Sequence, residues 1–382
     1  MPSSVPFFLV NAFSSDIAGG NPAAVVFLPE AFDTFTSNFP EGILQIIAKN
    51  FNQPIISFLA PLPTATQNQN ASGGEVGEAD YAIRWFTSDR EVPLCGHGTL
   101  AAARAILSKP DLAAMLKGRS AEIDEQVDVL RFRTVTGEVV SAFRLPDTPN
   151  NPVEHIQLTL SEAPTVPISP TSELGVKIIS ALSRAFQRPA EDLDVVYMGH
   201  GQGVFDFYLL VEVGLGDGLD GKQMVTDAFV CFRYLFFFCS PANIRRYEKK
   251  GTGYIVNVVT SSSTKPDETF ISRMFAPLAG VSEGMIIALR PAGCPQRFSK
   301  LIDSSSLDQV CGSAHCLLTP YWATKRAVSM PSSEQTKQLE APMNARQASQ
   351  RGGELLTHWD TKAGKITLSG KSVVWGEGNL VL

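Results

Sequence analysis

Short runs that are apolar throughout or that alternate apolar with polar residues dominate the chain and predict β-strands. Apolar residues at helical spacing predict helices over residues 43–50 and 173–186. Two further stretches, residues 93–107 and 310–323, begin as glycine-containing turns and continue as apolar helices. The predicted strands cover residues 7–12, 23–28, 55–59, 81–86, 127–133, 138–144, 155–160, 194–198, 205–213 and 254–259.

Turn-forming residues divide these elements. Residues 61–79 are rich in Thr, Asn, Gln, Ser and Gly, and they predict a solvated loop. Thr136-Gly137 predicts the turn of one hairpin, and Ser369-Gly370 predicts a second hairpin that closes the C-terminal end.

The distribution of elements predicts an α+β fold. Strands outnumber helices, and each half of the chain has one prominent apolar helix, which does not fit a doubly wound sheet. The proline-rich residues 164–170 are interpreted as a linker. We therefore expect one domain over residues 1–165 and a second over residues 166–370, and we leave open whether residues 371–382 return to the first.

The composition indicates a globular cytoplasmic protein. Of the 382 residues, 44% are apolar and 18% are charged, which argues against a disordered chain. The net charge of −6, without a basic block, argues against nucleic-acid binding. The best membrane candidate, residues 228–239, contains Arg233 and is shorter than the ~18 residues of a membrane span. Six cysteines are too few for a disulfide scaffold, so reduced thiols are expected.

A short element occurs twice. Residues 95–98 read CGHG and residues 311–314 read CGSA, and an apolar helix follows each of them. The two elements lie one domain length apart, as expected if a duplicated domain placed one in each half. No glycine-rich nucleotide-binding motif is present, so no nucleotide cofactor is expected.

The chemistry of each element favours an anion and a thiol. The first backbone N–H groups of a helix have no partner inside the helix, and the helix dipole attracts negative charge. A cysteine at that position is expected to have a lowered pKa. Two opposed elements would hold a carboxylate and place Cys95 and Cys311 on either side of its α-carbon. The alternative is that both cysteines are small buried core residues.

Several motifs make the chain similar to the phenazine-biosynthesis PhzF-like family. The resemblance implies a diaminopimelate-epimerase-like fold, in which two similar α+β domains each wrap a mostly antiparallel sheet around a central helix. The active site would lie in the cleft between them, without metal or organic cofactor, and a homodimer is a family expectation. The motifs are NAF at 11–13, GNPAAVV at 20–26, RWFT at 84–87, EVPLCGHGT at 91–99, GSAH at 312–315, PYW at 320–322 and QASQRGG at 347–353.

The resemblance also implies site residues. It puts His97, Asp308 and Ser313 at active-site positions. In our interpretation, Asn21 would orient the substrate together with these three residues. The resemblance further implies that the substrate carboxylate binds to the backbone amides of four residues, Gly96, His97, Gly312 and Ser313.

Two departures from the family pattern indicate a change of mechanism. The position of the family's proton-shuttling Glu is occupied by Ile55, which cannot carry a proton. Cys311 stands where the family has Thr, so that Cys95 and Cys311 both match the thiol positions of diaminopimelate epimerase and proline racemase. Our hypothesis is that two thiols replace the Glu shuttle.

Two stretches, residues 225–241 and 284–307, do not fit the family. Joining Glu283 to Asp308 restores the adjacent Glu-Asp pair of the family, which favours retained introns. A genuine lid or an oligomer surface is the alternative.

These observations favour a cofactor-independent isomerase that racemises or epimerises the α-carbon of a small carboxylate, such as an amino acid or a derivative. Cys95 and Cys311 would exchange the proton. A PhzF-like isomerase that moves a hydrogen or a double bond, with Asp308 or His97 as the base, is one alternative. A family member that has lost activity and serves as a binding protein is the other.

Overall fold

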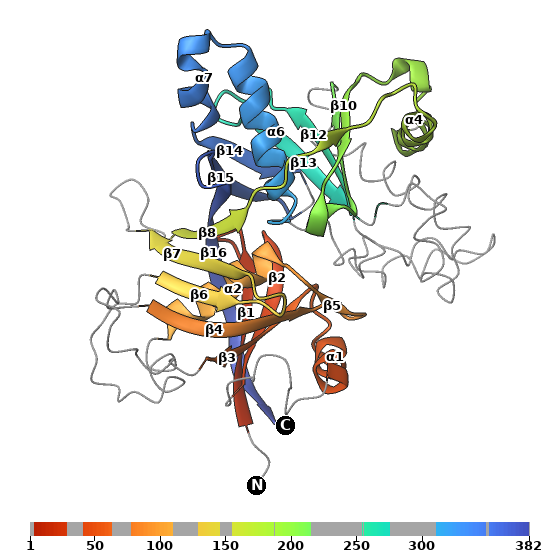
Figure 1. Ribbon diagram of the computed structural model, residues 1–382. Coiled ribbons are helices and arrows are strands. Elements are labelled where there is room, and N and C mark those ends of the chain that lie inside the picture. Colours follow the sequence, from red (N-terminus) through yellow and green to blue (C-terminus); the bar gives the residue numbers. More distant parts are fainter. Residues whose placement is uncertain are drawn as a thin grey trace, which may run out of the picture.

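The chain folds into two halves, each built on a sheet with a central helix (Figure 1). The computed structural model describes residues 4–28, 41–62, 78–109, 129–145, 155–186, 188–214, 254, 256–275, 311–348 and 351–381. Asp308 and the stretches 225–241 and 284–307 lie outside the described residues.

Strands hold more of the described residues than helices do, in agreement with the α+β prediction. The first half contains β1 (Ser4–Ala12), β2 (Asn21–Phe27), β3 (Ile56–Pro61), β4 (Glu78–Phe86), β5 (Glu91–Val92), β6 (Val129–Arg133), β7 (Val139–Leu145) and β8 (His155–Ser161). The second half contains β9 (Val166–Pro167), β10 (Val195–His200), β11 (Tyr208–Val213), β12 (Val256–Ser262), β13 (Phe270–Phe275), β14 (Met343–Gln347), β15 (Gly353–Asp360) and β16 (Lys365–Val381). The helices are α1 (Glu41–Phe51), α2 (Gly96–Ser108), α4 (Glu173–Phe186), α6 (His315–Val328) and α7 (Ser332–Leu339), with 3₁₀ turns η1 (Ala190–Asp192) and η2 (Gly203–Phe205).

The strands hydrogen-bond in one continuous order, β1-β2-β3-β4-β6-β7-β8-β16-β15-β14-β13-β12-β11-β10-β9, and β1 also pairs with β16. Strands β1 to β4, β6 to β8 and β16 therefore form a closed ring around α2, and β5 pairs with β4 outside this order. The long β16 belongs to both halves, because it lies between β8 and β15 at its beginning and pairs with β1 along residues 372–381.

The pattern of strand directions repeats in the two halves. From β1 to β8 the successive pairings are antiparallel, parallel, antiparallel, parallel, antiparallel and antiparallel. From β10 to β16 the same sequence of directions recurs. In this correspondence α2 and α6 occupy equivalent places, each between the strands of the second parallel pair. The repeat agrees with two similar halves.

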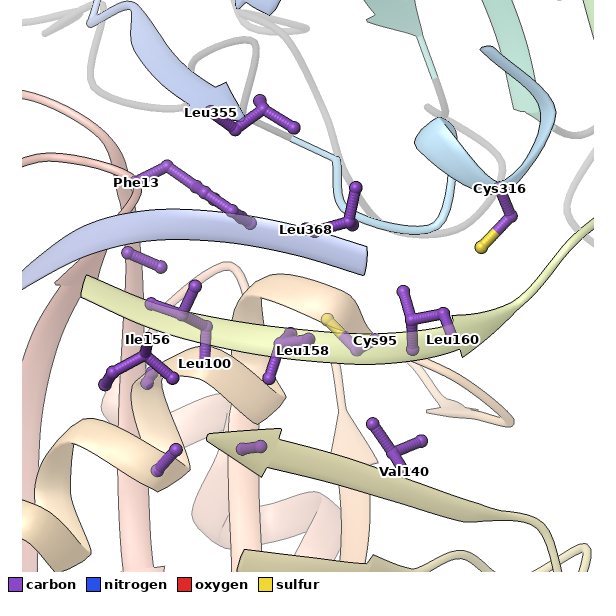
Figure 2. Packing of buried hydrophobic residues seen from close by; sticks show 14 of the residues in the cluster. Phe13, Cys95, Leu100, Val140, Ile156, Leu158, Leu160, Cys316, Leu355 and Leu368 are labelled. Carbon is purple, nitrogen blue, oxygen red and sulfur yellow. The ribbon is translucent and has the colours of Figure 1, made fainter. Parts of the chain in front are cut away.

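Helix α2 is buried on nearly all sides, which is unusual for a helix in water and typical of one inside a closed layer. Its many alanines let the surrounding strands approach closely, and each buried methyl adds to the hydrophobic stabilisation. The same core cluster continues into the second half. Figure 2 shows part of this cluster, with Cys95, Leu100 of α2, Leu160 of β8 and Cys316 of α6.

Helix α6 carries Pro320 in its interior, where proline cannot donate a hydrogen bond to the carbonyl four residues earlier. That carbonyl belongs to Cys316, and it accepts the backbone N–H of Ala163 at 2.9 Å instead. Ala163 lies on the segment between β8 and β9 that connects the halves. The proline therefore frees an acceptor that ties the connecting segment to α6.

The hairpin predicted at Ser369-Gly370 is wrong. Strand β16 runs without interruption through both residues. A Cβ atom on Gly370 would lie 2.6 Å from Cδ1 of the buried Phe13. The glycine is needed there to make room for an aromatic ring of the first half, not to form a turn. The other hairpin is confirmed, because β6 and β7 pair across a turn in which Gly137 has a φ of 82°.

The two halves touch where their central helices begin. A Cβ atom on Gly96 would lie 2.8 Å from Cα of Gly312, and one on Gly312 would lie 2.9 Å from Cα of Gly96. Both contacts are with backbone, which cannot rotate away as a side chain can. The N-terminal ends of the helical segments therefore meet at two positions that exclude any side chain.

Replacing Gly312 with Ala is expected to destabilise the protein by about 1–3 kcal/mol, because the new methyl must separate the two backbones. Urea unfolding measures the change. Gly42→Ala is the matched control: Gly42 lies in α1 with no atom within 4 Å of an added Cβ. Alanine there is expected to be neutral or to stabilise by up to about 1 kcal/mol. Equal stability of the two variants would contradict the tight contact.

Candidate active site

The two cysteine-glycine elements are built on the same plan. Cys95 directly precedes α2, and Cys311 precedes the turn that leads into α6. In each element the side chain four residues later donates a hydrogen bond to the cysteine carbonyl: Thr99 Oγ1 to Cys95 at 2.7 Å, and His315 Nδ1 to Cys311 at 2.8 Å. These bonds hold the backbone of each cysteine against the start of its helix.

Each sulfur also has a polar neighbour two residues later. Cys95 Sγ lies 3.2 Å from His97 Nδ1, and Cys311 Sγ lies 3.2 Å from Ser313 Oγ. The backbone N–H of Cys311 donates to Gln347 Oε1 of β14 at 2.9 Å. The second element is thus anchored to the sheet of its own half as well as to its helix.

One cavity of about 320 Å³ brings most of the predicted site residues together. Both cysteines line it, one from each half, and so do the polar and glycine positions that the sequence predicted. The eighth predicted residue, Asp308, lies outside the described residues. The predicted residues in the lining are Asn21, Cys95, Gly96, His97, Cys311, Gly312 and Ser313.

The rest of the cavity wall is mainly apolar. Ile55 lies in it and is buried, at the position that the family resemblance assigns to a proton-carrying Glu. The charged side chains of the lining are Arg90, Glu91 and Glu138. The other apolar residues are Pro54, Val92, Pro93, Leu94, Val204, Phe205, Phe207, Val256 and Met274.

Burial, rather than the helix, controls the ionisation of Cys95. The expectation of a lowered pKa is wrong for this residue: desolvation raises the pKa of its thiol to about 12, although backbone hydrogen bonds at Gly98 and His97 act in the opposite direction. The negative charge of an ionised Cys311 raises it further, so the two sulfurs are near enough to interact. Cys95 therefore carries its proton at neutral pH.

His97 is neutral in this environment. Burial lowers the pKa of its imidazole to about 3. It remains a hydrogen-bonding group, but a pKa this low makes it a weak general base.

Asn21 is held in place by the other half of the molecule. It begins β2 directly after Gly20, which has a φ of 67° and whose added Cβ would lie 2.3 Å from the carbonyl oxygen of Ala12. Arg351, from the segment between β14 and β15, donates to the carbonyls of Gly19 and Gly20, both at 2.9 Å. The turn before Asn21 is therefore tied to the second half.

Three supporting residues were not predicted: Gln347, Arg351 and Tyr208. Gln347 and Arg351 belong to the QASQRGG motif, so the sequence pointed to these two residues but did not indicate what they do. Tyr208, whose hydroxyl lies 2.8 Å from Ser313 Oγ, stands in no motif. Among the described residues, no cluster of three or more His, Cys, Asp or Glu side chains could hold a metal ion, and no helix could cross a membrane.

The model of the phenazine biosynthesis-like protein family matches residues 10–159 and 306–378, more than half of the chain. The chain belongs to this family. Both cysteine-glycine elements fall inside the matched residues.

Individual proteins extend the likeness to nearly the whole chain. An uncharacterised isomerase from Halalkalibacterium halodurans is 28% identical over 353 residues, which cover 92% of this chain and 90% of that protein. A PhzF-family structure from Enterococcus faecalis has a TM-score of 0.58 at 21% identity, with all of both chains covered. A predicted epimerase from Pseudomonas aeruginosa has a TM-score of 0.55 at 14% identity, with 99% of both chains covered. These two structures confirm the predicted fold.

Iodoacetamide, which reacts with thiolates, is expected to modify Cys311 before Cys95 at pH 8. Cys311 is half-buried, whereas Cys95 is buried and only about one part in 10⁴ of its thiol is ionised at that pH. Because the pKa of Cys95 is raised, its alkylation should increase about tenfold per pH unit until the pH approaches 12. Peptide mass spectrometry of the intact protein after timed alkylation separates the two sites.

The buried Cys316 serves as the internal reference for this experiment. Burial raises the pKa of its thiol well above the usual value, and it does not line the cavity, so it should react more slowly than Cys311. Equal alkylation rates for Cys95 and Cys311 at pH 8 would contradict the deeper burial and the raised pKa of Cys95.

Proposed function

We propose that this chain is a cofactor-independent isomerase that inverts the configuration at the α-carbon of a small carboxylate. One observation supports this most directly: Cys95 and Cys311, from opposite halves, line one cavity beside the contact of Gly96 with Gly312. Inversion needs a base on one face of the α-carbon and an acid on the other. Two cysteines on opposed elements would meet that requirement.

The proposed step moves one proton off the substrate and one onto it. The Cys311 thiolate takes the α-proton, and the electron pair of the C–H bond passes into the carboxylate as an enolate. The Cys95 thiol then gives its proton to the opposite face of the carbon. The cysteines end the turnover with their protonation states exchanged, and the reverse reaction or exchange with water restores them.

The difficult part of this step is the negative charge that develops on the substrate. The backbone amides at the starts of the two helical segments, Gly96, His97, Gly312 and Ser313, would bind the carboxylate where that charge accumulates. Fixed dipoles in a site without water stabilise such charge more than water does. The apolar lining around Ile55 and Phe207 favours exclusion of water.

The same lining bears on the substrate. Beyond the carboxylate-binding amides the wall is mainly apolar, so we propose a carboxylate with an apolar side chain, such as an apolar amino acid. Aliphatic or aromatic groups would gain by burial against this wall. A charged side chain would lose hydration and would have only Arg90, Glu91 and Glu138 of the lining as possible charged partners.

Family membership favours one other candidate, an isomerase that shifts a hydrogen with Asp308 or His97 as the base. Its proton-carrying Glu is replaced by Ile55 in the cavity wall, and the lowered pKa of His97 makes that imidazole a weak base. These two features favour the two-cysteine reaction.

Proton exchange in D₂O tests the proposal. We expect the wild-type protein to incorporate deuterium at the α-carbon of an apolar amino acid and to racemise it, measured by NMR and chiral chromatography. Cys95→Ser and Cys311→Ser should each lower racemisation by about 10²-fold or more. Each variant should retain exchange with one enantiomer only, since the remaining thiol faces one side of the carbon.

Cys316→Ala is the matched control, because it removes a cysteine of the same core cluster that does not line the cavity. Its exchange rate should stay near that of the wild type. Racemisation at the wild-type rate in both serine variants would refute the two-cysteine reaction. Absence of exchange with every carboxylate of a broad panel would favour a binding protein.

A further inference from the structure

The resemblance between the two elements ends at the neighbours of the sulfur atoms. Beside Cys95 stands His97, a buried neutral imidazole. Beside Cys311 stands Ser313, whose hydroxyl is also 2.8 Å from the hydroxyl of Tyr208. A chain of three groups, from phenol to hydroxyl to sulfur, thus reaches only one of the two cysteines.

Tyr208 is well placed to act through this chain. It is the first residue of β11, it is buried with 6% of its surface exposed, and it lines the cavity that holds both cysteines. Burial raises the pKa of its phenol well above the usual value, so the hydroxyl keeps its proton. The group is therefore a permanent hydrogen-bond donor near Cys311.

The donors and acceptors of Tyr208, Ser313 and Cys311 determine which way each hydrogen bond between them points. A thiolate can only accept, and a serine hydroxyl has one proton to give. When Cys311 is ionised, the Ser313 proton points to the sulfur, and the serine oxygen is free to accept the phenol proton. When Cys311 is protonated, its S–H can donate to Ser313. The serine hydroxyl then no longer has to donate to the sulfur, and the hydrogen bond from Tyr208 is no longer directed towards the sulfur through it. The full chain therefore favours the ionised sulfur.

We propose that Tyr208 is a positioning residue that acts through Ser313 to stabilise the thiolate of Cys311, so that Cys311 rests as the base and Cys95 as the acid. The assignment of base and acid rests on the proposed function. The effect on the ionisation of Cys311 does not, and it can be measured without a substrate.

Other titratable groups surround Cys311 and must be kept unchanged in the test. Cys95, directly before α2, interacts with it electrostatically, and Cys316 and His315 belong to its own helical segment. His315 is neutral, because burial lowers the pKa of its imidazole to about 4. The cavity lining adds His97, Arg90, Glu91 and Glu138. Removing the Tyr208 hydroxyl alters none of these side chains.

The test is the pH dependence of iodoacetamide alkylation at Cys311, resolved by peptide mass spectrometry on the full chain. In Tyr208→Phe the midpoint for Cys311 should rise by about half a unit to one unit, the effect of losing a typical hydrogen bond. A purely structural role for the phenol would leave this midpoint where it is in the wild type. That result, in a variant with the wild-type circular dichroism spectrum, would overturn the proposal.

A double-mutant cycle tests the route through Ser313. Ser313→Ala should raise the Cys311 midpoint at least as much as Tyr208→Phe does. Adding Tyr208→Phe to Ser313→Ala should then produce no further rise, because the connecting hydroxyl is already gone. A further rise equal to that of Tyr208→Phe alone would show that the phenol acts independently of Ser313 and would overturn the proposed route. If Tyr208→Phe fails to fold, an unchanged midpoint in Ser313→Ala overturns the proposal by itself.

Tyr197→Phe is the matched control. Tyr197 lies on the adjacent strand β10, and its hydroxyl bonds to the hydroxyl of Thr165 at 2.5 Å. Its loss should leave the Cys311 midpoint unchanged, and a shift equal to that of Tyr208→Phe would overturn the specific role. A shifted midpoint in Tyr208→Phe without any isotope exchange in the wild type would refute the proposed function and leave the Tyr208 assignment intact.

Discussion

The contact between Gly96 and Gly312 is the constraint on which the site depends. It brings the N-terminal ends of two helical segments together without any side chain between them. Each of these ends carries a partial positive charge, so placing them side by side is electrostatically unfavourable. An anion beside both ends removes that repulsion and gains from both dipoles. The packing of the shared core holds the two ends in an arrangement that favours a bound anion.

The shared strand β16 explains how the contact is maintained. Along its first part it pairs with β8 and β15, and along its last part with β1. Moving one half against the other would break backbone hydrogen bonds on several strands at once, each costly to lose when buried. The bond from Ala163 to the carbonyl freed by Pro320 adds a further link. The relative position of the two cysteines is therefore a property of the fold as a whole.

Much of this architecture could be predicted from local patterns. The turn-helix elements at Cys95 and Cys311 were recognisable because glycine and apolar spacing act over a few residues. The hairpin predicted at Ser369-Gly370 was wrong, because a glycine that makes room for Phe13 cannot be distinguished in the sequence from a glycine that forms a turn. The contacts of Tyr208 with Ser313 and of Arg351 with Gly20 join residues 105 and 331 positions apart, which no local pattern records.

The raised pKa of Cys95 could also not be predicted from the sequence, because the sequence indicates the start of the helix but not how deeply the cysteine is buried. It nevertheless suits a two-cysteine reaction better than the lowered pKa that was expected. Two thiolates in one apolar cavity would repel each other and would leave no acid to complete the inversion. Since an ionised Cys311 makes ionisation of Cys95 less favourable, the two sulfurs are kept from being thiolates at the same time. In the proposed reaction, similar elements would thus perform opposite roles, and their different neighbours, His97 and Ser313, would set which role each takes at rest.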